Sequence, residues 1–356
     1  MSGTQQPARD LKKIRVLVIQ LARLGDTLQS LMALRAAKQL YPQLEIHILV
    51  RERFSSAVKN VAWLDGVHVL KTDEIIGPLL NGQEKERDAL RKLAVWVGPL
   101  VTEMWDMTLN WTYTEASSFL TGLLPARVKL GFSRRKDFSL SAADGWSNYI
   151  HGMVQGGAPQ NIHLTDILTT QLLTALQIHY GEGTGDGNAS VTAKGFFETQ
   201  PATKAWVSDL LDSSKKWVTI QMGAVAAAKT WPSEKWAEFA SRVLRENPNW
   251  NVVVLGGKED QSRLDRFLEC VDPRVDQQGR IDPLVGETDF DLWAEVIGRL
   301  QWLVAGDTAA IHLASILGTR VINLSIGPVR WAETGPYGNF HYVIAPKAGC
   351  DGCKLR

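Results

Sequence analysis

A glycine, an acid and a threonine stand together at Gly306-Asp307-Thr308, directly after the short apolar run 300–305. The run is typical of a buried parallel strand, and helix-period residues follow it as far as Gly318. A strand, a tight turn and a helix start leave several backbone N–H groups without helical partners and directed at one point. The aligned peptide dipoles attract anions to that point, above all phosphates. An acid in the turn can also hold sugar hydroxyls. An ordinary helix cap explains Asp307 and Thr308 equally well when they are considered alone.

A second acid, Asp26, has a similar setting near the start of the chain. Residues 14–19 are an expected strand and 21–25 a loop; Asp26 and Thr27 then open an expected helix that leads to a strand at 45–50. This order predicts a strand–helix–strand unit of a parallel sheet, with its ligand-binding loops at the carboxyl ends of the strands. The first turn has no G-x-G-x-x-G pattern, which argues against a dinucleotide site there. Asp26 is either a functional acid or the cap of its helix.

Composition limits the classes of protein that fit. The chain has 356 residues, of which 45% are hydrophobic and 22% charged, and a formal net charge of +1. Its length predicts two domains, and its charge gives no general attraction to nucleic acid, so no such partner is expected. The three cysteines make no disulfide framework, and residues 1–13 lack the apolar stretch of a secretory signal. With no apolar stretch of transmembrane length either, we expect a cytoplasmic protein.

Expected strands and helices alternate along both halves of the chain. This alternation predicts an α/β protein with two Rossmann-like, doubly wound domains that face a central cleft. Residues 181–190 are rich in glycine and polar residues and have no periodicity, which is typical of a linker. We therefore expect a first domain at 1–180, a linker at 181–200 and a second domain at 201–356.

Five segments together resemble glycosyltransferase family 9, the ADP-heptose:lipopolysaccharide heptosyltransferases. They are LARLGDTLQSLMALRAAKQLYP, MGA followed by KTWPSEKWAEFA, VVVLGGKED, VAGDTAAIHLASILGTRVINLSIGP and GPYG, in an order that extends from Arg15 to Tyr342. The resemblance implies the GT-B fold, with the acceptor on the first domain and a sugar nucleotide on the second. It also implies inverting, metal-independent transfer of a heptose-like sugar from an ADP-sugar to a saccharide, the inner core of lipopolysaccharide. No further cofactor is expected.

The resemblance assigns catalytic roles to two residues. Asp26 matches the acid of the family's LGD motif and is expected to take the proton from the acceptor hydroxyl, which is general-base catalysis. Lys229 matches a lysine before Trp-Pro and is expected to neutralise charge on the departing ADP. A solvated loop lysine is the alternative interpretation for Lys229.

Donor binding is expected mainly on the second domain. Glycine and alanine after a strand let phosphates approach the backbone, and the acids are expected to hold the sugar and the ribose. The expected donor-binding residues are Gly223, Ala224, Lys229, Glu259, Asp307, Thr308, Ala309 and His312. For His312 a satisfied, partly buried histidine is as good an interpretation as a ligand contact.

Arg134, Arg135 and Lys136 form the densest basic patch of the sequence. Guanidinium groups suit carboxylates and phosphates, so we expect this patch to bind an anionic glycolipid acceptor. A solvated loop is an equally good explanation. The expected protein is a monomer with peripheral contact to the inner membrane.

Two patterns resemble metal sites, and no metal is expected at the first. Asp289-Phe290-Asp291 spells D-x-D, but it follows Thr288 at an expected helix start, where acids are common. Cys350 and Cys353 form a C-x-x-C pair that needs about two further ligands. The helix with which GT-B proteins usually end, crossing back to the first domain, is missing before Arg356, so we expect a shortened chain or a fragment of a longer protein.

Other functions fit parts of this pattern. The same chemistry could act on a protein acceptor, or a GT-B-like fold could epimerise a sugar nucleotide. A sugar-nucleotide-binding module without catalysis is the non-enzyme alternative, and the presence of Asp26 and Lys229 argues against it.

Overall fold

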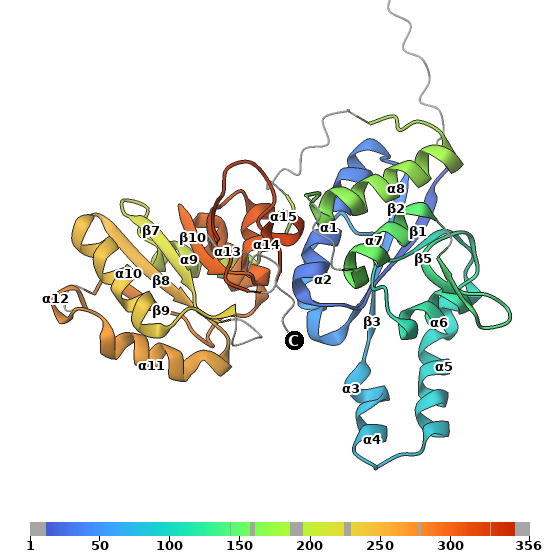
Figure 1. The fold of residues 1–356 in the computed structure, drawn as a ribbon, viewed down its shortest axis with the longest axis horizontal. Helices are drawn as coiled ribbons and strands as arrows, with labels where there is room; N and C mark the ends of the chain where they lie inside the picture. The colour runs from blue at the N-terminus through green and yellow to red at the C-terminus, as the bar shows by residue number, and fades with distance from the viewer. Residues whose placement is uncertain are drawn as a thin grey trace, which may run out of the picture.

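The computed structural model describes residues 12–142, 144–156, 161–185, 195–223, 229–276, 279–327 and 329–345. These residues form two α/β domains that stand side by side, each built on a mostly parallel sheet with helices packed against it (Figure 1). The expectation of two doubly wound, Rossmann-like domains is thereby confirmed.

The first sheet has the strand order β3-β2-β1-β4-β5-β6, and its pairs are parallel except β5 with β6. Its strands are β1 (Ile14–Gln20), β2 (Leu44–Arg51), β3 (Gly66–Leu70), β4 (Trp105–Asn110), β5 (Ala126–Arg134) and β6 (Leu140–Ala142). In β1, Leu17 and Val18 point to opposite faces and both are fully buried. A central parallel strand covered by helices on both sides requires such a continuous apolar run.

The second sheet has the order β12-β11-β10-β7-β8-β9 and is parallel throughout. Its strands are β7 (Lys216–Gln221), β8 (Trp250–Leu255), β9 (Ile281–Pro283), β10 (Trp302–Gly306), β11 (Arg320–Leu324) and β12 (Tyr342–Ile344). Because β10 lies between β7 and β11, the turn after β10 opens near the middle of the sheet's carboxyl edge.

Helices cover both sheets, and two of them meet between the domains. The first domain contains α1 (Leu24–Leu40), η1 (Glu52–Phe54), α2 (Ser56–Lys59), α3 (Thr72–Ile75), α4 (Gly77–Leu80), α5 (Glu86–Thr102), α6 (Glu115–Leu123), α7 (Gly145–Gly156) and α8 (Leu164–Tyr180). The second contains α9 (Pro201–Leu210), α10 (Ser233–Glu246), η3 (Lys258–Asp260), α11 (Gln261–Cys270), α12 (Pro273–Asp276), α13 (Phe290–Arg299), α14 (Ala309–Leu317) and α15 (Trp331–Thr334). α1 packs against α8 and also against α14 of the other domain (Figure 1).

Specific contacts join the domains around this meeting point. The Tyr337 hydroxyl donates to Asp166 Oδ1 at 2.6 Å, and the Asn60 amide donates to Asp291. Phe196, fully buried, packs its ring edge-on against Trp63. The expected linker at 181–200 is described only outside 186–194, so the domain boundaries stay a prediction.

Candidate active site

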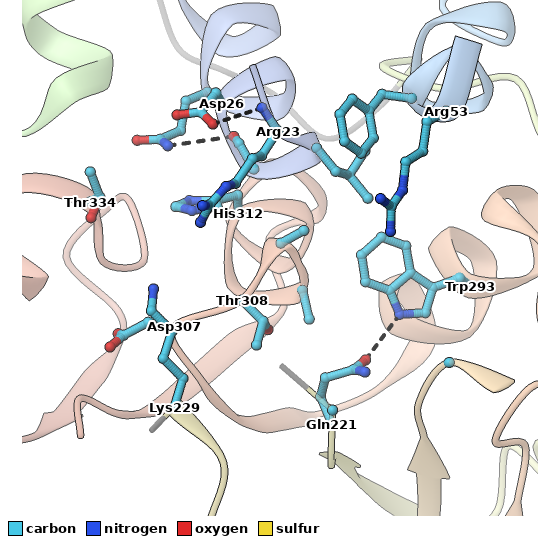
Figure 2. Close-up of a pocket in the computed structure, with 18 of the residues that line it drawn as sticks. Arg23, Asp26, Arg53, Gln221, Lys229, Trp293, Asp307, Thr308, His312 and Thr334 are labelled. Carbon is cyan, nitrogen blue, oxygen red and sulfur yellow. Dashed lines mark hydrogen bonds between the residues drawn. The ribbon is translucent and has the colours of Figure 1, made fainter. Parts of the chain in front are cut away.

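A cavity of about 630 Å³ lies between the two domains and is lined by residues of both. Its volume is in the range of small-molecule sites. Asp26 lines it from the first domain, and Gly223, Lys229, Glu259, Asp307, Thr308, Ala309 and His312 line it from the second. Figure 2 shows Asp26 on the opposite side of the cavity from Lys229 and Asp307. Ala224 lies outside the described residues.

Asp26 is held in the first turn of α1, at the carboxyl end of β1. Its Oδ2 accepts the backbone N–H of Arg23 at 3.0 Å, so the carboxylate does cap its helix while it also lines the cavity. Burial raises the pKa of Asp26, and the Arg23 N–H together with the positive charges of Arg23 and Lys229 opposes that rise. A carboxylate with a raised pKa is a stronger base than an exposed one. Capping and base catalysis are therefore compatible for this residue.

Lys229 and Asp307 lie beside each other on the second domain, against Gly327. A Cβ on Gly327 would lie 2.8 Å from Lys229 Cγ and 3.1 Å from Asp307 Oδ2, so only glycine leaves room for both side chains. Burial lowers the pKa of Lys229, while the negative charges of Asp307 and Asp26 act to raise it. The pair places a cation beside a carboxylate. Such a pair suits a ligand in which a phosphate, bound by the cation, lies next to a sugar hydroxyl, bound by the carboxylate.

Thr308 is the N-cap of α14, with extended backbone, and its side chain makes no capping hydrogen bond. Its Oγ1 is buried without a hydrogen-bond partner among the described residues. The first N–H groups of a helix have no partners within it, and the helix dipole adds positive potential at this end. The start of α14 therefore offers the cavity a hydroxyl and backbone donors suited to an anion.

Gly223 and Gly257 both line the cavity and lie against the buried Asp260. The Gly257 N–H donates to Asp260 Oδ2 at 3.0 Å, and a Cβ on Gly223 would come within 1.8 Å of the same oxygen. Glycine at 223 is thus required by close packing against a carboxylate. Glu259 is exposed and lines the same cavity, where its carboxylate could accept a hydrogen bond from a ligand hydroxyl.

His312 connects the two domains at the start of their facing helices. A Cβ on Gly25 would lie 3.0 Å from His312 Cδ2, so the bare backbone of α1 rests on the imidazole. Burial, helped by the charges of His163 and Lys229, lowers the pKa of His312 to about 3. The ring is therefore neutral, and its Nδ1 is buried without a hydrogen-bond partner among the described residues. Packing between the domains is a role that the sequence did not indicate.

The burial of His312 predicts acid sensitivity. Its pKa is about 3 when folded against 6.5 in an exposed state, so below pH 6.5 the unfolded chain binds more protons. The free energy of unfolding is expected to fall by about 1.4 kcal/mol per pH unit through this residue. Urea titrations at pH 7 and pH 5.5 measure this loss of stability in the wild type and in His312→Gln. The loss between the two pH values should be larger in the wild type than in the variant. Because other buried histidines act in the same direction, an equal loss in both proteins would contradict the assignment to His312.

Arg134, Arg135 and Lys136 do not line the cavity. Arg134 Nε donates to Ser118 Oγ at 2.9 Å, and Arg135 Nη1 donates to the Leu140 carbonyl at 3.1 Å. The structure places them at the β5–β6 hairpin instead, and their binding of an acceptor stays a prediction.

The D-x-D pattern has structural contacts. Asp289 is the N-cap of α13, where its Oδ1 accepts the Leu292 N–H at 2.9 Å, and Asp291 accepts the Asn60 amide across the domain boundary. Cys350 and Cys353 lie outside the described residues.

The cavity residues that the sequence interpretation missed include Arg23, Arg51, Arg53 and Trp293. Arg51 ends β2 and Arg53 follows it, and β2 pairs with β1, so the rule that ligands bind at carboxyl ends could have identified both. The Arg51 Nη2 donates to the Ala22 carbonyl at 2.7 Å and so braces the loop before Asp26. Trp293 donates its Nε1–H to Gln221 Oε1 at 3.2 Å across from Arg53 (Figure 2). No sequence signal separated this tryptophan from the twelve others.

Two solved glycosyltransferase structures have a fold similar to that of this chain. A glycosyltransferase family 9 protein from Veillonella parvula matches 96% of this chain and 89% of its own at a TM-score of 0.72 and 17% identity. The E. coli heptosyltransferase WaaC with ADP matches 96% of both chains at a TM-score of 0.68 and 18% identity. This likeness shows that the chain has the GT-B fold, with two Rossmann-like domains and a cavity between them.

The family follows from the sequence comparisons. The model of glycosyltransferase family 9 (heptosyltransferase) matches residues 99–354, and the chain belongs to this family. It is 21% identical over 335 residues to the lipopolysaccharide core heptosyltransferase OpsX of Haemophilus influenzae, across 92% of this chain and 83% of that protein. Transferase activity on a glycosyl group is therefore the class of function. Among the described residues, no helix combines the length and apolar character needed to cross a bilayer.

Proposed function

We propose that this chain is an inverting transferase that moves a heptose-like sugar from ADP to a hydroxyl of a saccharide, the inner core of lipopolysaccharide. The observation that carries the proposal is the pairing across one cavity of Asp26 with the anion-binding wall of Lys229 and Thr308. The names of the similar proteins support the sugar and the acceptor: one is a lipopolysaccharide core heptosyltransferase and another was solved with ADP. The chain would act as a cytoplasmic monomer at the inner membrane face, with no resident cofactor.

The proposed reaction is one displacement. The acceptor oxygen forms a bond to the anomeric carbon from the face opposite the diphosphate, and the bond from that carbon to the diphosphate oxygen breaks. Asp26 takes the hydroxyl proton, which is general-base catalysis. ADP departs with the extra negative charge, which Lys229, Arg23 and the N-terminus of α14 neutralise. Because the chain itself supplies these positive groups, the proposal needs no metal ion.

A nucleotide panel tests the donor half of the proposal. A ligand that binds only the folded state raises the free energy of unfolding by about 2.7 kcal/mol at a concentration 100 times its Kd. The unfolding temperature rises as a result. Thermal unfolding with ADP, UDP, GDP and NAD at equal concentrations should show stabilisation by ADP above the others. Stabilisation by UDP, GDP or NAD instead would overturn the choice of donor.

Transfer assays test the acceptor half. Incubation with ADP-heptose and truncated lipopolysaccharide should give a heptosylated product whose anomeric configuration, read by NMR, is opposite to that of the donor, at a rate unchanged by EDTA. A glycosylated protein in place of a glycolipid, an epimerised donor sugar, or ADP binding with no product on any acceptor would each contradict it.

Arg53 should bind a negatively charged group of the acceptor. This side chain is exposed, lines the cavity on the same domain as Asp26 and points to its interior (Figure 2). A hydrogen bond to a charged group contributes about 1.5–3 kcal/mol, so Arg53→Ala should raise the acceptor KM roughly ten- to a hundredfold with an unchanged Kd for ADP. Arg135→Ala, outside the cavity, is the comparison. If Arg135→Ala raised the KM of a soluble acceptor more than Arg53→Ala does, the acceptor site would lie at the β5–β6 hairpin and not in the cavity.

A further inference from the structure

Exposed apolar side chains gather at the tip of the β5–β6 hairpin and on the neighbouring α6. Phe138 is 70% exposed, Leu123 63%, Phe119 45% and Leu140 41%. These four residues are called the hairpin patch below. α6 and β5 lie on the side of the first domain that faces away from the second domain (Figure 1). Apolar side chains grouped on a surface and bordered by polar ones mark an interaction site.

The hairpin turn presents Phe138 at a cost in backbone energy. The Arg135 N–H donates to the Ser139 carbonyl at 3.0 Å and the Phe138 N–H to the Arg135 carbonyl at 2.9 Å, which closes a tight turn. Phe138 has φ 64° in this turn, a conformation that glycine and asparagine adopt readily and large residues rarely. The phenyl ring is largely in solvent, so burial in the core does not offset this backbone cost. The fold therefore offers no structural reason for phenylalanine at this position.

α6 extends the same surface. Phe119 and Leu123 are four residues apart and so share one face of the helix. A Cβ on Gly122 would lie 3.1 Å from Arg134 Cβ, so the helix rests directly on the end of β5. The Phe119 and Phe138 ring centroids are 6.5 Å apart, and the Arg134 guanidinium lies 4.3 Å from the Phe119 centroid. Helix and hairpin thus make one continuous patch.

Positive charge borders the patch. Arg135 and Lys136 are exposed at its edge. Asp137 is exposed as well, and its carboxylate accepts the Ser139 N–H at 3.0 Å and hydroxyl at 2.7 Å, so two cations stand beside one acid. Aromatic and aliphatic side chains flanked by cations suit the boundary of an anionic bilayer, where rings enter among the acyl chains and cations meet lipid phosphates.

We propose that the hairpin patch docks this chain on an anionic lipid surface. The inference rests on the membrane contact named in the proposed function and deepens it by assigning that contact to the hairpin patch. Its test requires neither donor nor acceptor. Docking also gives Arg135 and Lys136 a partner, lipid phosphate, that does not require them to line the cavity.

Vesicle sedimentation of the full chain tests the proposal. The wild type should bind vesicles of equal parts phosphatidylglycerol and phosphatidylcholine, bind pure phosphatidylcholine much less, and release as salt rises. Phe138→Gly should lower the binding constant roughly tenfold, the effect of withdrawing one large apolar side chain. Because glycine tolerates φ 64°, this variant should unfold at no lower temperature than the wild type. Ile178→Ser, which removes a 72% exposed side chain from α8, should bind as the wild type does.

Three outcomes would overturn it: no binding of the wild type to either vesicle, equal binding to both, or unchanged binding by Phe138→Gly combined with Phe119→Ser. Calorimetry with ADP on the same samples keeps the two proposals separate. Loss of vesicle binding with normal ADP affinity concerns the hairpin patch alone, and absent ADP binding with normal vesicle binding concerns the proposed donor alone.

Discussion

Replacement of Asp26 by asparagine should lower the rate of sugar transfer by about a hundred- to ten-thousandfold, the usual contribution of a general base. The amide has nearly the shape of the carboxylate, and its oxygen can still accept the Arg23 N–H that Asp26 Oδ2 accepts at 3.0 Å. The start of α1 should therefore persist while the proton acceptor is lost. Steady-state transfer, with the Kd of ADP measured separately, distinguishes loss of catalysis from loss of binding.

Asp26→Ala separates the cap from the base. It removes both functions, so it should lose the same transfer activity and, in addition, about 1 kcal/mol of stability from the lost cap. Asp209→Asn, an exposed carboxylate on α9, is the matched control and should keep full activity. Transfer by Asp26→Asn within tenfold of the wild-type rate would show that the carboxylate is only a helix cap.

The pH profile should carry the same signature. Because burial raises the pKa of Asp26, the fraction of active carboxylate should fall at a higher pH than for an exposed aspartate as the solution is acidified. The acid limb of kcat/KM should therefore lie above 3.8, the ordinary pKa of an aspartate, and be absent from the residual activity of Asp26→Asn. The proportion of folded protein must be checked at each pH, since the protonation of His312 destabilises the fold in the same direction.

The sequence was most informative where apolar runs end at a turn. The expected strand at 14–19 corresponds to β1 (Ile14–Gln20), and the run at 300–305 overlaps β10 (Trp302–Gly306). Buried parallel strands can be recognised in this way because both their faces must be apolar. The family resemblance then attached roles to the residues at the turns.

Helix starts were less predictable because side chains at a start compete with the backbone. α1 was expected to open with Asp26 but begins at Leu24, since the Asp26 carboxylate turns back to the Arg23 N–H. In the same way, η3 (Lys258–Asp260) precedes α11, which begins only at Gln261, and Asp260 turns back to accept the Gly257 N–H. Such local contacts depend on side-chain directions that a hydrophobic pattern does not contain.

The cavity's own composition was only partly predictable, because its walls come from different domains. Trp293 reaches it from within α13, and the contact of Gly25 with His312 joins residues that are far apart in the chain. A sequence pattern shows which residues share an element, but the approach of α1 to α14 depends on how the whole domains pack.

Lys229→Met should weaken ADP-sugar binding roughly ten- to a hundredfold, the loss expected for one charge-assisted hydrogen bond. Methionine keeps an unbranched apolar chain that can lie over Gly327, where the lysine stem now packs. Calorimetric titration with ADP measures the effect. Lys235→Met is the matched control, because Lys235 pairs with Glu238 on the nearby α10 at 2.9 Å and does not line the cavity.

The effects of Lys229→Met on donor affinity and on kcat together show what Lys229 does. Charge on the diphosphate grows as its bond to the sugar breaks, so a cation beside it should stabilise the transition state more than the bound donor. kcat should then fall together with affinity, and a fall in affinity alone would limit Lys229 to holding the donor. Since burial lowers the pKa of this ammonium group, wild-type activity should also decline at a lower alkaline pH than an exposed lysine would allow. An alkaline limb that is unchanged in Lys229→Met would refute the role of its charge.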